Sequence, residues 1–211
     1  MALPLRVRRR RPHPAQVSRS RVLLPGLALL AVLATAPFGG LKTAAVPPPE
    51  PLGLGQDLDL GPFTVRVEQV LSVPSVELAG GLEIEPASAR GRLLLVEVRA
   101  RNTTDEPQSS LQVAKAIGGP RAAVEPWPGD QDIRGDIVGV ADATRAGYVN
   151  PGLTLHALVI FSQPATWTAA TIDLSLSGYR FREDDPFSLE PQAWVLDGVL
   201  ARGPLPITVR T

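Results

Sequence analysis

A group of carboxylates in the middle of the chain has the residue types that a calcium ion requires. Asp130 and Asp132 occupy positions one and three of a loop that begins like an EF-hand, and a glycine occupies position six. Position five is Arg134 and position twelve is Ala141, so the loop lacks the bidentate glutamate of that motif. The pattern favours a solvated turn, and calcium binding in another geometry is the alternative.

An aromatic residue precedes this group in a stretch rich in proline and glycine. Trp127 lies between Pro126 and Pro128, where its ring either anchors a partner or folds back to cap one end of the domain; the cap is the favoured reading. The candidate interaction surface of the sequence is therefore the following set: Trp127, Asp130, Asp132, Arg134 and Asp136.

The residues that catalysis or metal binding would need are scarce. The chain has no cysteine and two histidines, His13 and His156. A zinc site needs three or four converging ligands, and a serine triad needs a histidine with an orienting acid. The chain has neither a Gly-x-Ser-x-Gly elbow nor a phosphate-binding glycine loop. We expect no catalytic residue, no metal site and no cofactor, and so not an enzyme.

Charge is distributed unevenly along the chain. Residues 1–42 contain eight basic residues and no acidic one, so the other 13 basic and 21 acidic residues leave the rest of the chain with eight excess negative charges. Binding to nucleic acid needs a basic surface that neutralises phosphates. The acidic composition therefore argues against a nucleic-acid partner.

An apolar segment near the N-terminus predicts insertion into a membrane. Residues 1–21 form a basic leader, and residues 22–38 are an almost unbroken apolar run at the short limit of a spanning helix. The basic flank predicts that the N-terminus stays in the cytoplasm and the rest lies outside. Ala34-Thr35-Ala36 resembles a cleavage site, but Pro37 follows it. We expect a retained signal anchor, with secretion after cleavage as the alternative.

Prolines separate this segment from the remainder of the chain. Residues 39–55 include Ala45-Val-Pro-Pro-Pro-Glu-Pro51, and consecutive prolines favour an extended, semi-rigid spacer. A proline motif that binds another domain is the alternative. This position between an apolar segment and a domain favours a linker.

From residue 56 onward, apolar and polar residues alternate with the period of two that is typical of half-buried β-strands. The most regular row lies in 91–104, where Glu97 and its neighbours of the same parity are expected to face solvent. Further rows lie at 63–73, 153–161 and 172–176, and helical patterns are nearly absent. A bulge at Ser177-Gly178 is expected to change the parity of the 172–176 row, so that Tyr179 and Phe181 continue it. A last strand or hairpin is expected around Asp197-Gly198.

These rows predict an all-β sandwich over residues 56–211, with a long excursion at 117–148. Three segments resemble the bacterial immunoprotective-extracellular-protein-like immunoglobulin-like domains: Gly61–Glu68, Leu93–Thr104 and Val149–Phe161. The resemblance spans about Gln56 to Leu176 and implies an immunoglobulin-like sandwich outside the membrane. It implies no catalytic residue, and that family is largely without an assigned function.

The sequence as a whole predicts a noncatalytic, membrane-anchored interaction module of the bacterial cell envelope. Its expected partners are the membrane, through a single N-terminal span, and another cell-envelope protein. The alternative is a domain that binds a small ligand, such as a carbohydrate, a lipid or calcium, with the 117–148 loop.

Overall fold

The computed structural model describes residues 47–78, 81–119, 124, 136–141, 147–183 and 193–211. In this part of the chain the main strands form one nine-stranded sheet, and two two-stranded sheets are also described. The nine-stranded sheet divides at β13 (Ala193–Val209) into two halves that pack against a shared core, called the first and the second sheet below. The fold is a β-sandwich, which confirms the fold class predicted from the alternating rows.

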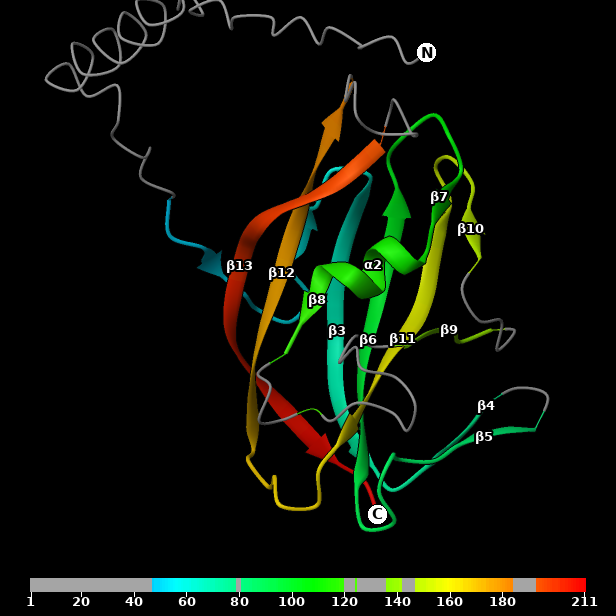
Figure 1. Ribbon diagram of the computed structural model, residues 1–211, viewed down its shortest axis with the longest axis vertical. Helices are drawn as coiled ribbons and strands as arrows, with labels where there is room; N and C mark the ends of the chain where they lie inside the picture. Colours follow the sequence, from blue (N-terminus) through cyan, green and yellow to red (C-terminus); the bar gives the residue numbers. More distant parts are fainter. Residues whose placement is uncertain (1–46, 79–80, 120–123, 125–135, 142–146, 184–192) are drawn as a thin grey trace, which may run out of the picture. The chain divides into compact units, whose positions relative to one another are not determined.

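The first sheet is organised around β6, which pairs antiparallel with β3 on one side and with β11 on the other. Figure 1 shows these three strands side by side. The strands of this sheet are β2 (Asp57–Asp59), β3 (Phe63–Val73), β6 (Arg92–Asn102), β11 (Thr154–Gln163) and β9 (Asp136–Gly139). The prediction that the 91–104 row is the central strand is confirmed.

The second sheet is organised around the long antiparallel pair β12–β13. Its strands are β1 (Glu50–Pro51), β8 (Ile117–Gly118), β12 (Thr171–Arg182) and β13 (Ala193–Val209). β13 runs without a turn through Asp197 and Gly198, so the alternative of a hairpin there is wrong. The bulge expected at Ser177-Gly178 is confirmed, because the register shifts on both sides of that pair.

The main core lies between the two sheets. The inward row of β6 consists of Leu94, Val96, Val98 and Ala100, each of which has no exposed surface. The inward residues of β12 meet them from the other sheet, since Ile172, Leu174 and Leu176 belong to the same buried cluster. Burial of such side chains is the dominant favourable term in folding.

A second, smaller core covers part of the outer face of the first sheet. Leu93 and Leu95 of β6 belong to it, together with Leu71 of β3 and Ile160 of β11. A short hairpin supplies further apolar side chains; its strands are β4 (Val76–Leu78) and β5 (Leu82–Ile84). The outer face of the β6 row is therefore only partly solvated, contrary to the expectation from alternation.

A β-bulge in β3 is the reason that this second core forms. Val67 pairs with Val98 and Gln69 pairs with Glu97, so Glu68 is an extra residue in β3. Because of the bulge, the side chains of Leu71 and Val73 lie on the outer face of the sheet and that of Val70 lies on the inner face. The expectation that the 63–73 row keeps one parity is therefore wrong.

The predicted excursion at 117–148 contains short elements at its ends. Before it, β7 (Gln108–Ser109) leads into α2 (Leu111–Ala116), a six-residue helix that the sequence patterns did not predict. The structure then describes β8, β9 and β10 (Tyr148–Val149), which pairs with β7. α2 buries Val113, Ala114 and Ala116 in the main core, and a helix this short depends on such tertiary packing.

The N-terminal leader and the predicted membrane segment, residues 1–38, lie outside the described residues. Within the residues that the structure does describe, no helix is long and apolar enough to cross a membrane. Part of the predicted linker is described: Glu50 and Pro51 pair with β13, and Leu52 is buried in the main core.

We predict that the core side chains of β6 dominate the stability of the sandwich. Leu94→Ala should lower the free energy of unfolding by about 2–5 kcal/mol, because Leu94 has no exposed surface and its loss leaves a cavity between the sheets. Leu153→Ala is the matched control, since Leu153 is 58% exposed, and it should change stability by less than about 0.5 kcal/mol. Chemical denaturation measures both, and equal effects would contradict this account of the core.

Candidate functional site

A groove opens at one end of the sandwich, where the β12–β13 pair extends past the main core. In this stretch Tyr179 pairs with Leu196 and Phe181 pairs with Trp194, so the four side chains share one face. Tyr179 packs against the main core, and Phe181 is 42% exposed. The bulge at Ser177-Gly178 therefore gives this end of the pair an aromatic inner face that the core does not cover.

The opposite wall of the groove is the turn that follows β6. Asn102 is fully buried and its amide donates to the carbonyl oxygens of Glu106 (2.7 Å) and Val149 (2.8 Å). Its Oδ1 accepts from the backbone N–H of Thr104 at 2.9 Å. The Asn-Thr-Thr sequence thus fixes the shape of the turn through the side chain of its first residue.

A glycine fixes the indole of Trp194. Gly61 has φ = 102°, and a Cβ atom there would lie 2.8 Å both from the Trp194 ring and from the carbonyl oxygen of Tyr179. The backbone N–H of Tyr179 donates to the carbonyl oxygen of Leu60 at 2.7 Å. Only glycine accepts both this backbone conformation and the close approach of the ring. The turn before β3 therefore serves as the support of Trp194.

The groove has a volume of about 680 Å³. Its lining consists of the 104–108 turn, Gln112 of α2, and Phe181, Ala193 and Trp194 of the β12–β13 pair. The rings of Phe181 and Trp194 have centroids 5.2 Å apart and planes tilted by 57°. A volume of several hundred cubic ångströms with aromatic walls and a few polar groups is typical of a small-ligand site.

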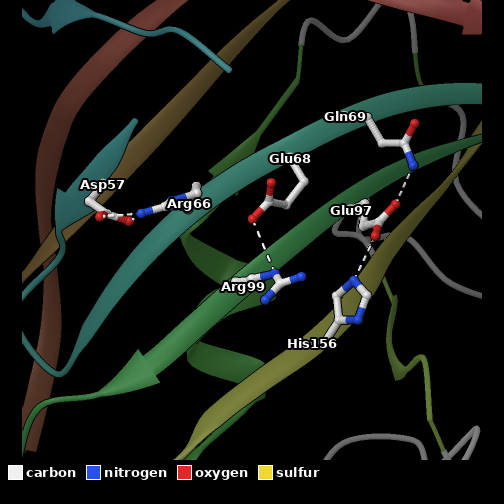
Figure 2. Close-up of polar contacts among 7 residues, drawn as sticks. All are labelled: Asp57, Arg66, Glu68, Gln69, Glu97, Arg99 and His156. Atoms are coloured by element: carbon white, nitrogen blue, oxygen red, sulfur yellow. Dashed lines mark hydrogen bonds and ion pairs between the residues drawn. The ribbon is translucent and has the colours of Figure 1, made fainter. Parts of the chain in front are cut away.

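A polar cluster on the outer face of the first sheet is the second candidate region. Figure 2 shows Gln69, Glu97 and His156, from three neighbouring strands, pointing toward one another. The amide of Gln69 contacts Glu97 Oε2 at 2.5 Å, and Nε2 of His156 lies 2.6 Å from Glu97 Oε1. The bulge at Glu68 makes this possible, because it brings Gln69 opposite Glu97.

Two ion pairs extend this outer face along the sheet (Figure 2). Nε of Arg99 lies 3.2 Å from Glu68, and Nε of Arg66 donates to Asp57 at 2.8 Å. These side chains are largely exposed, and exposed pairs of this kind add little to stability. We interpret the outer face as a structural set of cross-strand contacts.

The pKa of the Glu97 carboxyl lies below its ordinary value. Burial raises this pKa, but hydrogen bonds from Gln69 and His156, with the charges of His156 and Arg99, outweigh the effect of burial. The ionised carboxylate is therefore the form that the cluster stabilises. The contact between Glu97 and His156 joins residues that are 59 positions apart, and alternation along a single strand does not indicate it.

The interaction surface predicted from the sequence is described only at its last residue. Trp127, Asp130, Asp132 and Arg134 lie outside the described residues. Asp136 begins β9, where it pairs with Ile160 and accepts from the backbone N–H of Ile137 at 2.9 Å. Where the chain is described, no three potential metal-ligating residues come together. The calcium alternative at Asp130–Asp136 stays a prediction.

The groove residues were not identified from the sequence. Part of the signal lies in the sequence: the parity change at Ser177-Gly178 places Tyr179 and Phe181 in one row, and a strand is expected around Asp197-Gly198. The pattern could not show that Phe181 and Trp194 are paired across two strands, because that depends on two register shifts in β12–β13.

No protein-family model matches the sequence, and no curated protein matches it. Among solved structures the chain is similar to an uncharacterized β-sandwich protein from Clostridium difficile 630. The sequences are 8% identical, the match covers 77% of this chain and 98% of that chain, and the TM-score is 0.49. The assignment as a β-sandwich rests on the strand pairing and the core described above.

We predict that Glu97 makes the stability of the sandwich fall in acid. Because its pKa is depressed in the folded state, its contribution is complete above the ordinary value of 4.5 and is lost as the pH falls through the lower, folded-state value. Glu97→Gln should therefore flatten the pH dependence of the free energy of unfolding between about pH 5 and about pH 2.

Glu85→Gln is the control for this measurement, because it removes the same charge from an exposed residue. Denaturant titrations at a series of pH values compare the two variants with the wild type. If Glu97→Gln and Glu85→Gln alter the pH dependence equally, the Gln69–Glu97–His156 cluster is not its source.

Proposed function

We propose that this protein is a noncatalytic binding module of the bacterial cell envelope that takes up an extended segment of another envelope protein at one edge of β13. The observation that carries the proposal is an open strand edge beside exposed apolar side chains. An unpaired edge presents a row of backbone N–H and C=O groups that another strand can join.

The edge of β13 that faces away from β12 is occupied along only part of its length. Residues 207–209 pair there with β3, and Ala201 and Arg202 pair there with β1. In residues 193–200, β12 is the only strand partner in the described part of the chain. This edge already accepts an extended segment of its own chain at β1, immediately next to the open stretch.

Prolines explain why β1 does not cover the rest of the edge. β1 runs parallel to β13, so a longer β1 would place the residues before Glu50 beside the open stretch. They are Pro47, Pro48 and Pro49, which have no backbone N–H to donate to a neighbouring strand. The chain's own strand addition therefore ends at Glu50 and leaves residues 193–200 to a partner.

Apolar side chains flank this open edge. Leu196 is 46% exposed, and Val199 and Leu200 are each 43% exposed. Leu200 lies over Gly178 of β12, where a Cβ atom would come within 2.6 Å of it. When another strand joins an edge, exposed apolar side chains beside that edge can pack against the added strand. Backbone pairing would supply affinity, and these side chains would supply specificity.

The setting of this module is part of the same proposal. We infer an immunoglobulin-like sandwich displayed outside the cytoplasmic membrane and held there by a retained span at residues 22–38, with a secreted form after cleavage as the alternative. The apolar run, its basic flank and the net negative charge of the rest of the chain support this setting. The resemblance to the immunoprotective-extracellular-protein-like domains agrees with it and stays a prediction.

Substitution of Val199 tests the binding edge. Val199→Lys should reduce the yield of a photo-crosslink from residue 197 to the partner by about tenfold in intact cells, because a lysine hinders strand addition at an open edge. Val209→Lys is the matched control: Val209 lies on the same strand and is 62% exposed, but its edge pairs with β3.

Both variants should keep the unfolding midpoint of the wild type, because both positions are exposed. The crosslinked peptide of the partner should belong to an envelope protein and should lie in an extended segment. Equal crosslink yields in the two variants, or a cytoplasmic partner, would contradict the proposal.

The mass of the protein in its membrane fraction tests the anchor. We predict an intact mass near 22.4 kDa, resistant to extraction at high pH, because a retained span keeps the whole N-terminus. Removal of a signal peptide would lower the mass by about 4 kDa. Mass spectrometry of the extracted fraction decides between the two, and the lower mass would replace the anchored form with the secreted one.

A further inference from the structure

We propose that the groove at the end of the sandwich binds an organic cation, a guanidinium or an ammonium group, against the aromatic pair Phe181–Trp194. The groove shares Ala193 and Trp194 with the open stretch of β13, but it uses their side chains and not the backbone edge, and the inference does not depend on the proposed strand partner. Four features of the groove carry it: the sign of its charge, its aromatic wall, an acceptor without a donor, and its fixed shape.

The charged residues of the groove are both acidic. Asp105 and Glu106 lie in its lining, both on the turn after β6, and no basic residue is among the described residues that line it. Arg180 alternates to the opposite face of β12 and approaches Asp197 at 3.7 Å. A cleft with one sign of charge and apolar walls concentrates ligands of the opposite sign. The two carboxylates of this lining favour a cation over an anion.

The aromatic wall suits a cation with an apolar stem. Phe181 is 42% exposed, and its ring is tilted by 57° to that of Trp194 across a centroid distance of 5.2 Å. Two tilted rings present π faces and edges to the same space, and the negative face of an aromatic ring attracts ammonium and guanidinium groups. Tryptophan gives the strongest attraction of this kind, and guanidinium also stacks on its face.

An amide in the wall needs a hydrogen-bond donor. Gln112 lines the groove, and its buried Oε1 has no hydrogen-bond partner among the residues that the structure describes. Guanidinium and ammonium groups carry only donors, five and three respectively. The carboxylates of Asp105 and Glu106 are acceptors that such a ligand matches. A change in the side-chain rotamer of Gln112 on binding would bring the amide to the ligand.

The two walls have fixed shapes before any ligand binds. Asn102 holds the turn that carries Asp105 and Glu106 through the hydrogen bonds of its side chain, and Gly61 supports the ring of Trp194. Preorganised walls reduce the entropy lost on binding. A volume of about 680 Å³ accepts a small molecule or the end of a long side chain.

Calorimetric titration of the full-length chain tests the proposal, with agmatine and spermidine as free cations and N-acetyl-arginine amide as the equivalent of a peptide side chain. We expect saturable binding of at least one of these and none of 1,4-butanediol, which lacks the charge. Tighter binding of the arginine derivative would identify a protein side chain as the source of the cation, and tighter binding of the amines would identify a free polyamine.

Two variants locate the binding. The double variant Asp105→Asn/Glu106→Gln keeps the shape of the exposed turn and should weaken binding by at least about tenfold, because both charge-assisted contacts are lost. Phe181→Leu keeps an apolar side chain but removes a π face, and it should weaken binding of the cation by about threefold or more. In the wild type, ligand should shift the NMR signal of the Trp194 indole N–H.

The control variant is Asp173→Asn, which removes a carboxylate that pairs with Arg202 away from the groove lining. It should bind as the wild type does, and all variants should unfold cooperatively. The proposal is overturned if no organic cation binds at millimolar concentration, if 1,4-butanediol or a neutral monosaccharide binds as well as the cations, or if the charge-neutralised double variant binds as the wild type does.

Discussion

The burial of both faces of β6 is the constraint on which the rest of this structure depends. Leu94 and Val96 face the main core, while Leu93 and Leu95 face the second core, and all four are 3% exposed or less. A strand in this position needs partners on both edges and cover on both faces. β3 and β11 pair with its edges, and the β12–β13 layer and the β4–β5 hairpin cover its faces. The bulge at Glu68 allows β3 to contribute to both cores, because Val67 packs in the main core and Leu71 packs in the second core.

The two proposed binding features have a common origin in the length of the β12–β13 pair. The pair continues beyond the main core, where its inner face meets the turn after β6, α2 and the turn at Gly61. Its outer edge meets no described strand beyond β1. The aromatic groove is the uncovered inner face of this extension, and the open edge is its unpaired backbone. A core of two packed sheets is most complete at its centre, and for that reason binding sites on sandwiches concentrate at their ends and edges.

Much of the fold could be predicted from the residues alone because alternation is a local property. The central row of β6, the inward row of β11 and the buried residues of β12 were each identified from their period of two, and the bulge at Ser177-Gly178 from a change of parity. The candidate site could not be predicted in the same way. Trp194 and Phe181 are 13 positions apart, and Glu97 and His156 are 59 apart, so their contacts depend on register. α2 was missed because six residues are too few to show a helical period, and packing against the core stabilises them.

The sequence by itself determined that this protein is built from alternating strands with a central one at residues 91–104, and that its charge is divided between a basic N-terminus and an acidic remainder. Only the tertiary structure decided which polar residues of those strands meet, where the second core lies, and that β13 joins the two sheets while residues 193–200 have no second strand partner in the described part of the chain. The physical reason is that the period of a strand fixes which side chains share a face, whereas bulges and pairing register decide what that face meets. A single extra residue, Glu68, exchanges the inner and outer rows of β3 without changing the local pattern that identifies it as a strand.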